Sequence, residues 1–243
     1  MARHFSRRGL LVGGAGSGLL LAAGCDLIDL AKNPYFNIKL PPRVYELKSD
    51  DPNWKQPPAF FTASAISCNT PAECCPPPGL PPGAVSAADC AMVPIICQTK
   101  ICGIGFPLET HNAVNLGMEA PELASASGAV SEITLESLTF KITNAVGADF
   151  PPVRLYVAPE ATTTAKGAGV VLIGTTPMAP KDMTTTSTLE PPADAKAAFA
   201  MYARNVKTPF NFIAATDVAI LSGAMAPNGK VTIEVTGTIK VKL

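Results

Sequence analysis

The sequence predicts an all-β protein in which two sheets pack face to face, and three observations support this fold class. Apolar and polar residues alternate along several short stretches, most clearly from Val231 to Val241. Turn-forming residues such as Pro227-Asn228-Gly229 separate these stretches. Only one stretch spaces its apolar residues as a helix does. Many short strands divided by turns are typical of a β-sandwich.

The final stretch has the clearest strand pattern. One side of an extended chain would carry its apolar residues, which are Val231, Ile233, Val235, Ile239 and Val241, with Gly237 in the same row. Threonine, glutamate and lysine occupy the other side. This period of two predicts a half-buried antiparallel strand with one wet face.

Similar patterns occur earlier in the chain. Apolar residues alternate on both sides of Glu136-Ser137, where the phase slips by one residue. Such a slip predicts a β-bulge. Further strands are expected at Val153–Val157 and Phe210–Ile220. Val170–Ile173 is a continuous apolar run, which predicts a strand covered on both faces.

One short helix is expected between the strands. It begins at Pro191-Pro192, because proline is tolerated in the first turn of a helix. Its apolar residues recur at helical spacing, at Ala195, Ala198, Phe199 and Tyr202. We expect this helix to cross from one sheet to the other.

The N-terminal part of the body contains weaker strand patterns. Ile38–Lys48 is strand-like, but Pro41-Pro42 predicts that it lies at a sheet edge or breaks into two strands. Ala59–Ser67 is a further strand candidate. The threonine runs at 162–164 and 184–186 are expected in polar loops.

Taken together, the strands and the crossing helix favour an immunoglobulin-like β-sandwich with a Cys/Pro-rich, disulfide-linked loop. The Cys…Trp…Cys spacing of antibody domains is absent. This fold type is therefore inferred from the strands alone.

Residues 1–24 have the layout of an export signal. Arg3, Arg7 and Arg8 form a basic start, and an uncharged, mostly apolar segment follows from Gly9 to Gly24. That segment is shorter than the about 20 apolar residues a spanning helix needs, and its glycines weaken a permanent helix. An uncleaved anchor helix is the alternative interpretation.

The leader ends in Leu21-Ala22-Ala23-Gly24-Cys25, which resembles the lipobox of bacterial lipoproteins. The resemblance implies cleavage before Cys25 and attachment of diacylglycerol to its thiol, with palmitate among the fatty acids expected. Ser6–Leu11 is similar to the twin-arginine export motif, although Val12 replaces the usual lysine. Export by the general secretory route and export by the twin-arginine route both stay open.

The expected organisation is a signal peptide at 1–24, a lipidated tether at 25–37 and a β-sandwich domain at 38–243. A Cys/Pro-rich insertion is expected at 68–105. It contains six cysteines, which are Cys68, Cys74, Cys75, Cys90, Cys97 and Cys102. An even number behind an export signal predicts three disulfides with 15 possible pairings.

The spacing of these cysteines excludes only a few of the 15 possible disulfide pairings. Cys74 and Cys75 are adjacent and should bond to different partners. Cys97 and Cys102 could close a small turn over Gln98–Ile101. A metal site is the alternative, but the spacing is irregular and no histidine cluster is nearby, so we expect neither metal nor cofactor. The prolines at 76–82 predict an exposed polyproline segment, which either protects the chain or recognises a partner.

The charge of the processed chain limits its partners. Three of the 19 basic residues lie in the leader, so the remaining chain carries 16 basic and 19 acidic residues and a formal net charge of −3. No basic run is present to neutralise phosphates, so we expect no nucleic-acid partner.

Catalytic candidates are few. His111 is the single histidine after the leader, and Glu109–Asn112 is expected to be an exposed loop. Asp50-Asp51 and the pair Glu119 and Glu122 are carboxylates that lie near one another in sequence. Surface turns explain these carboxylates more simply than acid–base chemistry does.

We therefore expect a lipid-anchored cell-envelope lipoprotein with a non-enzymatic structural or binding role, with an envelope protein as a possible partner. The alternatives are a membrane-tethered hydrolase that uses a carboxylate pair and a solute-binding lipoprotein of a transport system. Asp26 after the lipidated cysteine resembles an inner-membrane retention signal of enteric bacteria. The choice between inner and outer membrane stays open.

Overall fold

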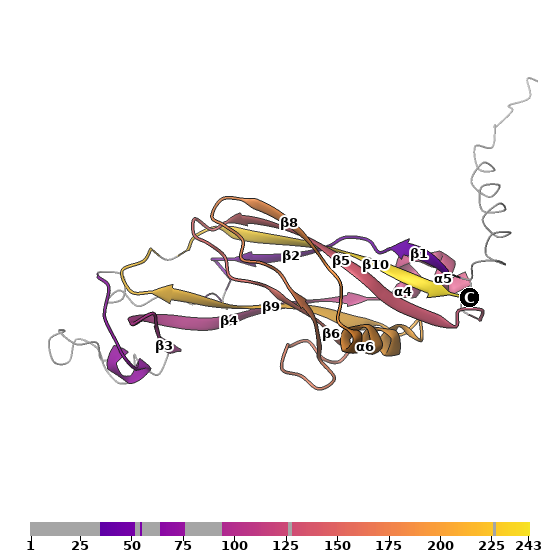
Figure 1. The fold of residues 1–243 in the computed structure, drawn as a ribbon, viewed down its shortest axis with the longest axis horizontal. Helices are drawn as coiled ribbons and strands as arrows, with labels where there is room; N and C mark the ends of the chain where they lie inside the picture. The colour runs from indigo at the N-terminus through magenta and orange to yellow at the C-terminus, as the bar shows by residue number, and fades with distance from the viewer. Residues whose placement is uncertain (1–34, 52–53, 55–63, 76–93, 126–127, 226) are drawn as a thin grey trace, which may run out of the picture.

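The computed structural model describes residues 35–51, 54, 64–75, 94–125, 128–225 and 227–243. Two five-stranded antiparallel sheets make up the body, and Figure 1 shows them as two long layers. Most apolar side chains of the strands are buried in one cluster between these layers. The expected all-β sandwich is thereby confirmed. The signal peptide, Cys25 and the polyproline segment lie outside the described residues.

Sheet A is built around the C-terminal strand. It contains β1 (Tyr35–Lys39), β2 (Arg43–Lys48), β5 (Glu132–Ala145), β8 (Thr184–Leu189) and β10 (Lys230–Lys242). Strand β10 pairs with β5 along one edge and with both β1 and β2 along the other. The alternation predicted for β10 is confirmed, since its odd-numbered residues from Val231 to Val241 face the core.

The bulge and the proline break in sheet A also match the sequence. Glu136 has no partner in the β5–β10 register, which passes from Ser137–Thr238 to Leu135–Ile239. Pro41-Pro42 separates β1 from β2, and both strands lie at the sheet edge. The first strand begins at Tyr35, inside the segment 25–37 that was expected to be a tether.

Sheet B contains the strands that position the cysteines. Its members, in spatial order, are β3 (Ile95–Gln98), β4 (Ile101–Val114), β9 (Phe210–Leu221), β6 (Arg154–Pro159) and β7 (Val171–Thr175). A two-residue turn joins β3 to β4, and both of its residues, Thr99 and Lys100, have positive φ. This conformation suits the twist of a tight hairpin. The insertion expected to be a loop up to Gly105 therefore ends in a hairpin.

Strand β4 was not expected from the sequence. Glu109–Asn112, which we expected to be an exposed loop, lies inside it, and His111 pairs with Ile213 of β9. Pro107 is tolerated there because β3 covers only the first four residues of β4 and leaves the rest as a sheet edge.

Three further expectations about strands were wrong. Thr184–Thr186 begins strand β8 rather than a polar loop. Strand β7 is an edge strand in which Leu172 is 41% exposed, so the apolar run at 170–173 is not covered on both faces. The segment 64–67, the described part of the candidate strand Ala59–Ser67, forms no strand, although Ser67 makes an isolated antiparallel bridge to Ile101.

The helices are short. They are η1 (Pro71–Cys74), α4 (Leu116–Glu119), α5 (Pro121–Ser125) and α6 (Ala193–Ala203). Helix α6 connects β8 of sheet A to β9 of sheet B and packs against β5, β6 and β7, which confirms the predicted crossing helix. Phe199 of α6 packs against both Phe210 and Phe212, with ring centroids 5.5 and 6.3 Å away. In the described part of the chain, no helix has the length and apolar character to span a membrane.

The molecule is elongated, and its two ends differ (Figure 1). We call the end formed by η1, β3 and the start of β4 the tip. The opposite end contains α4, α5, the first residue of β1 and the C-terminal residues of β10, and we call it the base. Tyr35, the first described residue, pairs with Lys242 at the base.

Candidate functional site

Two disulfides between described residues hold the tip together. Cys68 bonds to Cys97 and Cys74 bonds to Cys102, so β3 and β4 are each linked to the segment that precedes them in the chain. Cys75 is also disulfide-bonded, whereas Cys90 lies outside the described residues. The predicted disulfide linkage of this segment is therefore confirmed for the described cysteines.

The pairing expected between Cys97 and Cys102 was wrong. These residues face each other across the β3–β4 hairpin, and a turn does join their strands, but each sulfur bonds to the segment 68–74 instead. Backbone hydrogen bonds explain the choice. The Cys102 amide donates to the Ile66 carbonyl and the Cys68 amide to the Lys100 carbonyl, so this segment runs beside the start of β4.

The sulfurs of Cys68, Cys74 and Cys102 lie within 4.8 Å of one another. This spacing would suit a metal site if the three were thiolates. All three are in disulfide bonds, so they offer no thiolate ligand. The arrangement crosslinks the chain.

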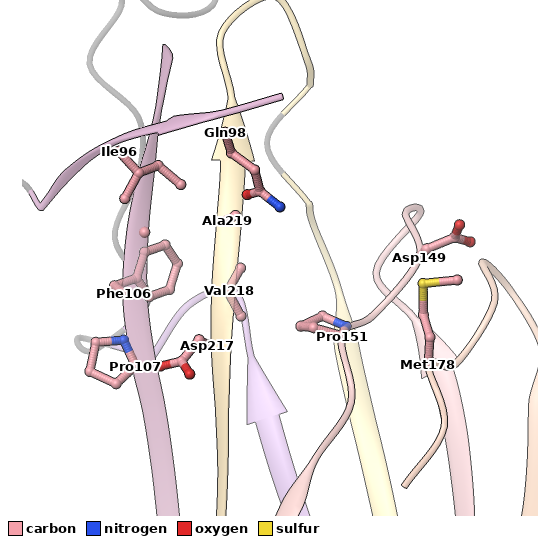
Figure 2. Close-up of a pocket in the computed structure, with 11 residues that line it drawn as sticks. Ile96, Gln98, Phe106, Pro107, Asp149, Pro151, Met178, Asp217, Val218 and Ala219 are labelled. Carbon is pink, nitrogen blue, oxygen red and sulfur yellow. The ribbon is translucent and has the colours of Figure 1, made fainter. Parts of the chain in front are cut away.

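A pocket of about 540 Å³ lies beside the tip (Figure 2). Its floor comes from β4 and β9, with Phe106, Pro107 and Val218, and β3 contributes Ile96. Asp149 and Met178 belong to loops at the other side of the pocket. The volume falls in the range of small-ligand sites, and an apolar floor with a few polar groups is typical of such sites.

The two carboxylates of this pocket are already engaged. Asp217 pairs with Arg154 at 2.5 Å, and the Asp149 carboxylate accepts a hydrogen bond from the Lys181 amide. Both carboxylates therefore already contact other groups of the protein. A ligand in the pocket would contact mainly apolar groups and the Gln98 amide.

A second cluster lies at the open edge between β2 and β4. Arg43 forms an ion pair with Glu119 of α4 and donates to the Ala113 carbonyl at 2.8 Å. The Glu119 carboxylate also accepts the Asn115 amide at the start of α4. The side chains of Arg43 and Glu119 are only 17% and 18% exposed. This ion pair joins sheet A to the strand–helix junction of sheet B.

Three polar atoms of this edge cluster are buried without a hydrogen-bond partner among the described residues. They are Nε of Arg43, Oε2 of Glu119 and the hydroxyl of Tyr45. Burial raises the pKa of Tyr45 well above 10, although the neighbouring Asn112 and Arg43 oppose the shift. The phenol therefore stays neutral in the folded protein.

We expect the buried Tyr45 to make the free energy of unfolding decrease as the pH rises above 10. The unfolded phenol ionises near pH 10, whereas the folded one does not, so its contribution is present below pH 10 and is lost as the pH rises. The free energy of unfolding should fall by up to about 1.4 kcal/mol per pH unit above 10. Tyr45→Phe should make this fall less steep. Equal slopes in wild type and Tyr45→Phe, from urea unfolding at pH 10 to 11.5, would contradict the assignment.

The other sequence candidates do not form a common site. His111 is exposed on the outer face of sheet B, and in the described structure it forms neither an ion pair nor a hydrogen bond through its ring. Asp50 and Asp51 lie in the turn after β2, as expected. Glu119 is engaged with Arg43, whereas Glu122 is exposed on α5.

Sequence reasoning missed the edge cluster and the pocket. The one available signal for the cluster was a charged residue, Arg43, at an inward position of a strand whose next inward residues are Tyr45 and Leu47. The pocket had no signal of this kind, because its lining comes from five separate segments.

Comparisons with known proteins identify no family. No family model matches the chain, and no curated protein matches it. The decameric BFDV capsid protein aligns over 86% of this chain and 99% of its own, with 9% identity and a TM-score of 0.38. Carbohydrate-binding modules of a β-sandwich superfamily align over 83% and 54%, with 10% identity and a TM-score of 0.26. Turnip yellow mosaic virus aligns over 58% and 93%, with 13% identity and a TM-score of 0.26.

These TM-scores are too low to support an argument about function. The described residues define a class by themselves: a two-sheet β-sandwich protein with a disulfide-linked tip at one end.

Proposed function

We propose that this protein is a lipoprotein of the bacterial cell envelope, anchored through diacylglycerol on Cys25, with a non-enzymatic structural or binding role. The lipobox-like sequence supports the anchor. The disulfides of the tip support a location outside the cytoplasm, because such bonds persist in oxidising compartments.

One observation carries the proposal: the described chain starts at the base, and the disulfide-linked tip lies at the opposite end. Cys25 precedes Tyr35 by ten positions, so a fully extended connection would span at most about 35 Å. The thirteen-residue strand β10 alone extends roughly 40 Å along the body. An anchor at Cys25 would hold the base near the membrane and direct the tip away from it.

The lipid would be sufficient as an anchor. Each buried methylene contributes about 0.8 kcal/mol, and stable attachment takes two acyl chains, which a diacylglyceryl cysteine supplies. No apolar surface of the sandwich is needed to hold it at the membrane. The protein surface is then available for a structural or binding role.

Within a binding role, the pocket beside the tip is a candidate location for a ligand. Its place beside the tip would make it accessible from the side away from the membrane. This pocket also favours a solute-binding lipoprotein. The hydrolase alternative has less support, because its candidate carboxylate Glu119 already forms an ion pair with Arg43.

Lipidation is tested by labelling with a fatty acid in a bacterial host. Wild type should incorporate the label and have an intact mass without residues 1–24, and Cys25→Ser should incorporate none. The matched control is Cys68→Ser with Cys97→Ser, which removes two other cysteines and should keep the label. Label that persists in Cys25→Ser would contradict the proposal.

A further inference from the structure

Three lysines gather on one face of the base. Lys39 is the last residue of β1, and Lys240 and Lys242 are at the end of β10. The register pairs Lys39 with Thr238, two positions before Lys240, so the three side chains lie on the outer face of sheet A. We call them the basal lysines.

Acidic partners do not neutralise the basal lysines. In the described structure none of them forms an ion pair, although Glu132 is opposite Lys242 on β5. The Glu132 carboxylate accepts a hydrogen bond from Thr134 instead. The lysines farther along the same face differ, since Lys230 pairs with Glu46 and Lys141 with Glu234. Unpaired positive charge on this face is therefore concentrated at the base.

An aromatic ring lies within this cluster. The ammonium groups of Lys240 and Lys242 lie 4.6 and 5.5 Å from the centroid of the Tyr35 ring, which is 38% exposed. Tyrosine is enriched at the interface between membrane and water, where its ring and hydroxyl meet both media. The combination of lysines with an exposed tyrosine suits a phospholipid headgroup layer.

We propose that the basal lysines bind the headgroups of anionic phospholipids in the membrane that holds the lipid anchor. This inference rests on the proposed function for its setting, because Tyr35 follows Cys25 closely enough to keep the base near the bilayer. The whole chain cannot supply the attraction, since its net charge after the leader is −3. The local cluster supplies it, and binding would orient the sandwich on the membrane.

The test uses vesicles and a chain that lacks the lipid. The processed chain from residue 25 with Cys25→Ser contains every described residue and is mixed with vesicles of phosphatidylcholine, with or without 30% phosphatidylglycerol. We expect co-sedimentation only with the anionic vesicles, lost at 0.5 M salt because salt screens the charges. Each lysine near an anionic surface contributes roughly fivefold to binding. Lys240→Gln with Lys242→Gln should therefore weaken it on the order of 20-fold.

The matched control changes the same charge on the same face at the other end of sheet A. Lys141→Gln with Lys230→Gln should weaken binding less than threefold. Equal losses in the two double variants, or equal binding to neutral vesicles, would overturn the proposal. Absence of binding to anionic vesicles would also overturn it. The measurement is independent of lipidation, so its failure is distinct from failure of the anchor at Cys25.

Discussion

Replacing Glu119 by leucine is expected to lower the free energy of unfolding by about 2–4 kcal/mol. The substitution leaves the Arg43 guanidinium largely buried, with the Ala113 carbonyl as its remaining partner. Removal of one partner from a buried ion pair is costly because the other charge stays desolvated. It also removes the acceptor of the Asn115 amide at the start of α4. Urea unfolding, followed by the fluorescence of the single tryptophan Trp54, measures the loss.

Two controls separate the buried charge from a general effect of the substitution. Glu190→Leu breaks an ion pair with Lys196 in which the glutamate side chain is 78% exposed, so it should cost far less than Glu119→Leu. Arg43→Leu combined with Glu119→Leu removes both charges and should recover most of the loss. A double variant that is less stable than Glu119→Leu alone would contradict this explanation.

Removal of the Cys74–Cys102 disulfide is expected to cost about 3–4 kcal/mol. The bond joins residues 28 positions apart, and a loop of this length loses about that much entropy in the unfolded chain when it is closed. Both sulfurs are fully buried, so Cys74→Ala with Cys102→Ala also leaves a small gap in the packing. The midpoint of urea unfolding should fall accordingly.

The Cys68–Cys97 disulfide provides a comparison for this experiment. The Cys68–Cys97 bond closes a loop of nearly the same length, so its removal should have a similar cost. The two loops overlap in sequence, and the quadruple variant should lose less than the sum of the two double variants. If a reducing agent left the unfolding midpoint of wild type unchanged, the disulfides would not contribute as described.

Strong alternation predicted the strands at the centre of sheet A. In β10 and β5 one face meets the core and the other meets water, so burial imposes a period of two on the sequence. The slip at Glu136 predicted the bulge for the same reason, because one extra residue reverses the faces. The crossing helix α6 was predicted from the spacing of its buried residues.

Edge strands were harder to predict. Strand β8 is composed mostly of threonine, and its two faces differ too little in polarity to produce an alternating pattern. Strand β4 contains Gly103, Gly105 and Pro107, which usually weaken or end a strand. Its pairing with β9, more than 90 positions later in the chain, overrides these local preferences. Contacts of this kind are not encoded in any short stretch of sequence.

The sequence alone determined the number of cysteines in the tip segment and the lipobox-like leader. It also determined β5 and β10 of sheet A, each of which has one buried and one exposed face. These features are local, since each follows from the composition or the period of one stretch. Only the tertiary structure decided which cysteines bond, which charges meet at the edge cluster and which lysines remain unpaired at the base. Each of these depends on distances between segments far apart in the chain, and strand pairing sets those distances.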